Sequence, residues 1–103
     1  MILVTTDYIS GKELETIGLV KGAAIETVSM FSDLAQFFKS LVGGELAVYR
    51  KMMNDARALA TKRMVEEAAD LGADGVVSIQ YASSSIMQHA SEVIVYGTAV
   101  KFK

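Results

Sequence analysis

The stretch that decides the fold is ELAVYRKMMNDARALATKRMVEEAADLG, residues 45–72. Apolar side chains return every three or four residues along it, at positions 46, 49, 53, 56, 60, 64, 68 and 71. This spacing predicts one amphipathic helix from Glu45 to Leu71, about 40 Å long. Gly72 is placed to end that helix. Three pairs of oppositely charged residues four positions apart would stabilise the solvent-exposed side of this helix: Lys51 with Asp55, Lys62 with Glu66, and Arg63 with Glu67.

Segments of strand character lie on both sides of this helix. Residues 2–6 predict a short first strand, and residues 13–29 predict a long strand with a bend or bulge at Gly18 and Gly22. After Gly75 the apolar period becomes two, which predicts two antiparallel strands joined by a polar loop from Ser83 to Ser91.

A shorter helix is expected just before the long one. Ser32 and Asp33 offer an N-cap to an apolar stripe that runs to Val42, and Gly43-Gly44 would stop the helix. The order is therefore β-β-α-α-β-β. We predict an α+β fold of two layers, with an antiparallel-rich sheet packed on one long helix plus a short helix, in a single domain of residues 1–103.

The composition predicts self-association. The 103 residues are 51% hydrophobic with a net charge of −2, and so small a domain buries only about two-thirds of its unfolded surface. Residues 93–100 carry apolar side chains on both faces of a predicted strand. We expect this strand to be a sheet edge, and Ile94, Tyr96 or Val95 to be buried by another subunit.

The residues argue against catalysis and against most cofactors. The chain has no Cys and one His, His89, in the Ser-rich segment. Thiolate chemistry and cysteine metal sites are excluded, and no acid–base pair, nucleophile arrangement or cofactor motif is present, so we predict a non-enzyme without cofactors. His89 is the one weak metal candidate. The paired Gly43-Gly44 before a helix could receive an anion, although helix breaking is the plainer interpretation.

Partners and location follow from charge and from what the chain lacks. Five basic residues cluster on the long helix, but the chain is acidic overall, which favours a solvated face over nucleic-acid binding. No run approaches a membrane span, the N-terminus does not resemble a signal peptide, and the absence of Cys fits a reducing compartment. We expect a cytoplasmic protein with no nucleic-acid or membrane partner.

Three segments together resemble the YbjQ family, an uncharacterised family often labelled putative heavy-metal-binding. They are Leu41–Gly44 followed by Tyr49, residues 67–77 (EAADLGADGVV), and residues 97–100 (GTAV). The resemblance covers essentially the whole chain. It implies a small subunit similar to dodecin-like folds and a ring-shaped homo-oligomer, with a pentamer as the expected size.

The chain departs from that family pattern at two charged positions. Family members commonly carry Arg after the paired glycines and Glu after the tyrosine, where this chain has Glu45 and Arg50. Residues five apart on a helix point 140° apart, so a reciprocal swap fits an ion pair between neighbouring subunits. Independent surface drift is the alternative.

The favoured function is a non-enzymatic oligomeric module that binds a small ligand or a partner at the subunit interface. The alternative is a metal-binding protein whose site is shared between subunits, since one His and no Cys cannot make such a site within one chain. The candidate ligand or interface residues are Gly43, Gly44, Glu45, Tyr49, Arg50, Ile94 and Tyr96.

Overall fold

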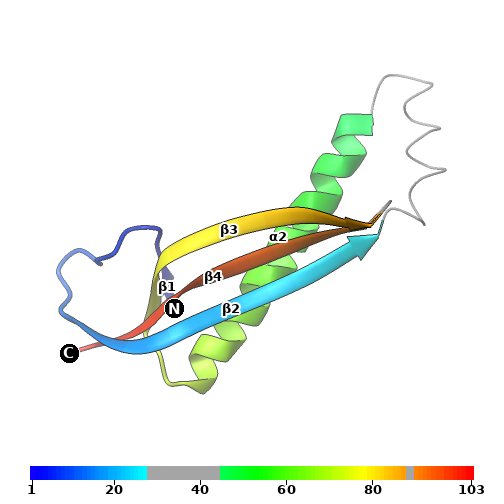
Figure 1. Cartoon of the computed structure of the whole chain (residues 1–103). Coiled ribbons are helices and arrows are strands. Elements are labelled where there is room, and N and C mark those ends of the chain that lie inside the picture. Colours follow the sequence, from blue (N-terminus) through cyan, green and yellow to red (C-terminus); the bar gives the residue numbers. More distant parts are fainter. Residues whose placement is uncertain (28–44, 88–89) are drawn as a thin grey trace.

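The computed structural model describes residues 1–27, 45–87 and 90–103 (Figure 1). In chain order these residues form β1 (Ile2–Leu3), β2 (Leu14–Thr27), α2 (Glu45–Asp70), β3 (Gly75–Met87) and β4 (Ala90–Phe102). The predicted α+β class is confirmed. The short helix predicted before Gly43 lies outside the described residues.

The four strands form one mixed sheet in the order β1-β3-β4-β2. The predicted antiparallel pairing of β3 with β4 is confirmed, and β2 also runs antiparallel to β4. The short β1 runs parallel to β3, so the sheet is not purely antiparallel. Helix α2 crosses one face of this sheet, as Figure 1 shows, which gives the expected two layers.

Helix α2 begins at the predicted residue and ends one residue earlier than predicted, at Asp70. Every fourth side chain along it is buried against the sheet: Met52, Ala56, Ala60, Met64 and Ala68. Four of these five face the sheet with 0% exposure, and alanines allow the helix backbone to approach the strands closely. Leu71, predicted to continue the apolar stripe, is 50% exposed because it lies beyond the last helical turn.

The end of α2 is formed by Gly72, as predicted. Its φ of +77° is a conformation that glycine adopts without steric cost. The N–H of Gly72 donates to the carbonyl of Ala69 at 3.0 Å, and the N–H of Ala73 donates to the carbonyl of Ala68 at 3.0 Å. This pair of bonds is a Schellman motif, which satisfies carbonyls that the helix leaves unpaired.

The core has two parts, one on each face of the sheet. The larger lies between α2 and the sheet and includes Val20, Met64 and Val95, all at 0% exposure. The smaller lies on the opposite face near the chain ends, where Ile9 packs with Val77 and Val100. Successive residues of β4 point alternately to the two faces of the sheet that carry these cores, which explains in part why both faces of the strand are apolar.

The two glycines of the second predicted strand have different roles. The register of β2 against β4 shifts between Thr16 and Gly18, which confirms the bulge expected there. No irregularity occurs at Gly22. A Cβ at Gly22 would overlap the carbonyl oxygen of Ala60 and lie 2.6 Å from the amide nitrogen of Met64, so this glycine lets α2 rest on the strand.

The predicted polar loop from Ser83 to Ser91 is wrong. Strand β3 continues to Met87, and β4 begins at Ala90. Ser83 is paired with Val93, and Ser84 with Glu92, within the ladder of β3 and β4. Both serines are exposed, so their hydroxyl groups stay in water while β4 satisfies the backbone, and nothing in this arrangement requires a loop.

The prediction that residues 93–100 form a sheet edge is also wrong. Strand β4 is central, with β3 on one side and β2 on the other. Val95, one of the three residues expected to be buried by another subunit, is fully buried within its own chain. The edges of the sheet are instead β2 on one side and β1 with β3 on the other.

Candidate functional site

The sheet face turned away from α2 carries an unusual number of exposed apolar side chains. We call it the outer face and define it by alternate residues of three strands that the pairing registers place side by side: Leu19, Lys21, Ala23, Ile25, Gln80, Ala82, Ser84, Ile94, Tyr96 and Thr98. Leu19 is 67% exposed, Ile25 is 57% exposed and Tyr96 is 43% exposed. Polar side chains, Lys21 among them, lie between these apolar ones, and exposed apolar surface rimmed by polar residues is typical of interaction sites.

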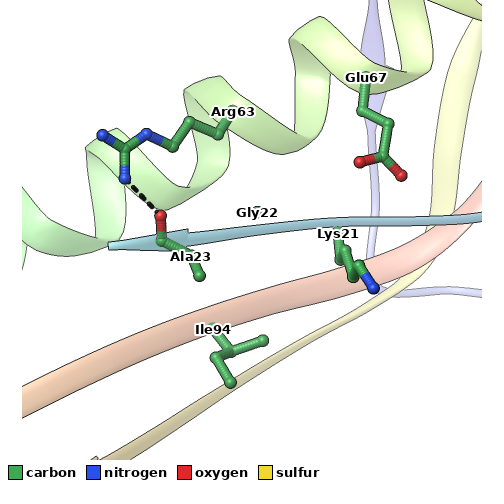
Figure 2. A pocket seen from close by; sticks show the side chains of 6 residues that line it. All are labelled: Lys21, Gly22, Ala23, Arg63, Glu67 and Ile94. Carbon is green, nitrogen blue, oxygen red and sulfur yellow. Dashed lines mark hydrogen bonds between the residues drawn. The ribbon is translucent and has the colours of Figure 1, made fainter. Parts of the chain in front are cut away.

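A groove of about 350 Å³ runs along the edge of this face. Six residues line it: Lys21, Gly22, Ala23, Arg63, Glu67 and Ile94. Figure 2 shows the side chains of Arg63 and Glu67 extending from α2 toward β2, whereas Lys21 and Ile94 lie on the other side of the strand. The groove therefore follows the edge strand between the helix and the outer face.

Arg63 is the residue that joins helix and edge strand at this groove. Its Nη1 donates a hydrogen bond of 2.6 Å to the carbonyl oxygen of Ala23 (Figure 2). The predicted ion pair of Arg63 with Glu67 is not among the salt bridges of the described residues, whereas Lys51–Asp55 at 3.2 Å and Lys62–Glu66 at 4.0 Å are confirmed. An exposed ion pair four residues apart on a helix contributes only about 0.3–0.5 kcal/mol, so little stability is lost when Arg63 binds the carbonyl of Ala23 instead.

The groove has a lining that combines charged side chains with backbone groups. Its lining offers two cationic side chains, one carboxylate and backbone groups of an edge strand, and it contains no hydroxyl, thiol or imidazole side chain. Its size is within the roughly 300–1,000 Å³ of small-molecule sites. The lining suits a ligand or a polypeptide segment with hydrogen-bonding groups of both kinds.

The residues predicted as candidates are not gathered in one place. Ile94 and Tyr96 lie on the outer face, and Ile94 also lines the groove. Arg50 is exposed on α2. Glu45 and Tyr49 belong to α2, but their side chains, like Gly43, Gly44 and His89, lie outside what the structure describes.

Sequence reasoning missed Lys21, Arg63 and Glu67 as neighbours of Ile94. Arg63 and Glu67 were interpreted only as partners within the helix. The one signal that could have found this groove is Gly22, because a glycine in a strand also marks a place where another backbone comes close.

The described residues contain neither a cluster of metal ligands nor a helix suited to span a membrane. Within residues 1–27, 45–87 and 90–103, no three His, Cys, Asp or Glu side chains come together as ligands of one ion. The described carboxylates of a single subunit therefore do not fit a metal site. Among the described helices, none combines the length and the apolar character needed to cross a bilayer.

Comparison with known proteins gives a consistent result over the whole chain. A family model described as "Putative heavy-metal-binding" matches residues 1–103. A UPF0145 protein of Clostridium novyi is 63% identical over 98% of this chain and 98% of its own. One of Alkaliphilus metalliredigens is 60% identical over 99% of both chains, and one of Methanosarcina acetivorans is 45% identical over 98% of this chain and 96% of its own.

A solved structure shares the fold at low sequence identity. It is a protein of unknown function from Pediococcus pentosaceus assigned to the DUF74 family, with a TM-score of 0.68 and 13% identity. The match covers 100% of this chain and 98% of the other. It extends the similarity from sequence to the arrangement of the strands and the helix.

Proposed function

Because the chain belongs to the YbjQ family of UPF0145 proteins, we propose that it is a non-enzymatic subunit of a homo-oligomeric ring, expected to be a pentamer, in the cytoplasm. The ring would bind a small molecule or a partner at the interface between subunits. As the family resemblance implies, the subunit would be similar to dodecin-like folds.

The observation that supports this proposal is the outer face. Leu19, Ile25 and Tyr96 lie there with about half of their surface or more in water. Complete burial of a fully exposed side chain of this kind contributes about 1.5–3 kcal/mol, so burying the part that these three still expose contributes roughly half of that for each. Packing against another subunit is one way to bury them together. The groove beside this face provides concave space next to the same interface.

Sedimentation velocity of the purified chain tests the assembly. We expect the wild-type protein to sediment as an oligomer at micromolar concentration and Leu19→Glu to dissociate it, because a charge on the outer face would have to be desolvated in the interface. Leu71→Glu is the matched control, since Leu71 is 50% exposed at the end of α2 and away from the outer face. A monodisperse wild-type monomer would overturn the proposal.

Ligand binding is tested on protein isolated under native conditions. Mass spectrometry of the intact assembly is expected to reveal a small molecule that is retained by wild type and lost from Arg63→Met. Retention by wild type with no loss in that variant would place the ligand elsewhere.

The family description supports a second candidate, a metal site shared between subunits. The ring would have to bring the single His89, or a carboxylate, from each subunit to a symmetry axis. Titration of metal-free protein with zinc or copper tests this candidate by calorimetry. Heat no greater than that of dilution, with no protection against unfolding, would eliminate it.

A further inference from the structure

The sheet has two edges whose backbone groups lack a partner strand among the described residues. One edge is the whole of β2. The other is β3 after Ile79, because the N-terminal segment follows β3 only that far: the N–H of Ser78 donates to the carbonyl of Thr6, and the N–H of Ile79 to that of Val4. Strand β3 then continues to Met87 with β4 on one side only.

The residues that direct their backbone groups out of each edge follow from the ladder. In an antiparallel pair, alternate residues turn both N–H and C=O toward the same side. The carbonyl of Ala23 points out of the sheet edge, since Arg63 of α2 donates a hydrogen bond to it. The backbone N–H and C=O of Lys21, two residues earlier, therefore point out of the edge as well. On β3 the N–H of Ile79 points out of the edge, so the backbone N–H groups of Tyr81 and Ser83 point outward too.

Among the described residues, the β3 edge lacks the charged and proline residues that prevent strands from pairing. Natural edge strands are blocked by charged side chains, proline or a covering element. No charged residue and no proline occurs in β3 from Gly75 to Met87, and the chain contains no proline. Strand β2 does carry charged residues, Lys21 among them, and Arg63 binds the carbonyl of Ala23, but its small residues Gly22 and Ala23 line the groove at this edge.

We propose that β2 of one subunit pairs with β3 of a second copy, so that one sheet continues from subunit to subunit. This inference rests on the proposed homo-oligomer and adds a strand-to-strand contact to the interface that would bury the outer face. Strands β2 and β3 are both antiparallel to β4, so they run in the same direction within a subunit. Rotation about an axis along the strands keeps that direction, and the pairing across the interface is parallel.

The two edges are different surfaces, so the contact is head-to-tail. A head-to-tail contact between copies closes into a ring when the rotation between neighbours divides a full turn evenly, and otherwise continues as a filament, whereas pairing of β2 with β2 would stop at a dimer. Arg63 limits where the neighbour can pair, because it already uses the carbonyl of Ala23. The N–H of Ala23 and both backbone groups of Lys21 then serve the incoming strand.

Two proline variants test this interface without touching the ladders inside the subunit. Ala23→Pro removes an outward N–H from β2, and Ser83→Pro removes one from β3; proline is tolerated on an edge strand where its nitrogen faces away from the sheet. We expect each variant to keep the wild-type circular dichroism spectrum and to sediment as a monomer, with the dissociation constant raised about tenfold or more. Ala23→Ser and Ser83→Ala keep the N–H groups and are expected to assemble as wild type does.

Mixing the two proline variants gives the decisive measurement. Each variant keeps one intact edge, so an equimolar mixture is expected to form a heterodimer and nothing larger. Wild-type-like assembly of either proline variant alone, or dimers of Ser83→Pro alone, would refute the β2-to-β3 contact while leaving the oligomer intact. A monomeric wild type would instead refute the proposed function, and the interface with it.

Discussion

A substitution at Gly22 is the most direct test of how closely helix α2 packs on the sheet. In Gly22→Ala the new methyl group would overlap the carbonyl oxygen of Ala60 and lie 2.6 Å from the nitrogen of Met64, where an ordinary contact begins at 3.4 Å. Both atoms belong to the helix backbone, so no side chain can turn away to relieve the overlap. Helix α2 therefore has to move away from β2 by about 0.8 Å or more.

A gap of that size forfeits a quarter to a half of the dispersion attraction between the facing atoms. Val20 and Met64, both fully buried at this contact, are each stabilised by about 1.5–3 kcal/mol. With smaller losses from the neighbouring alanines, the free energy of unfolding should fall by about 3 kcal/mol, the upper end of overpacking costs. For a slope of about 1.5 kcal/mol per molar urea, the midpoint falls by about 2 M.

Urea unfolding followed by circular dichroism measures this change at one protein concentration. Gly18→Ala is the matched control, because the same methyl group on the same strand would have no atom within 4 Å. Its cost is limited to the positive φ of that residue, about 1 kcal/mol. If both variants unfold at the same urea concentration, the close approach of helix and strand at Gly22 is refuted.

Three further substitutions test local contacts by thermal unfolding. Gly72→Ala forces a φ of +77° on a residue with a Cβ and should cost about 1 kcal/mol; an unchanged melting temperature would contradict the Schellman motif. Asp74→Ala removes the carboxylate that accepts the N–H of Phe102 at 2.8 Å and should cost about 1.5 kcal/mol, whereas Asp74→Asn should keep part of that bond through its carbonyl oxygen. Tyr81→Phe removes the 2.8 Å hydrogen bond to Thr61 at an exposed site, so its effect should stay near 0.5 kcal/mol, and a cost above about 2 kcal/mol would show that the hydroxyl has another role.

Local features were predictable from the sequence because they depend on neighbouring residues. The 3.6-residue period of α2, the Gly72 terminus and the bulge at Gly18 each follow from side-chain spacing or from glycine's freedom. The serines at 83 and 84 misled the prediction because residue type signals a loop, although an exposed strand position accepts a small polar side chain equally well.

Features that depend on strand order were not predictable in the same way. Residues 93–100 looked like an unprotected edge because both faces are apolar, yet β4 is central: one face meets α2 and the other carries Ile94 and Tyr96. The groove depends on Arg63 reaching a carbonyl forty positions earlier in the chain. The apolar periodicity of the sequence does not predict such a contact, since it forms only when the helix packs on the sheet.

The pairing of β2 with β4 has a consequence for how the chain acquires its structure during synthesis. Leu14 pairs with Phe102, so the first long strand leaves the ribosome many residues before its partner exists. By contrast, β3 and β4 are neighbours in the chain and can pair locally as soon as β4 has been made. Until β4 is complete, β2 has no ladder and can pack only against α2, which contacts it at Gly22, so the pairing of β2 with β4 is the step that completes the sheet.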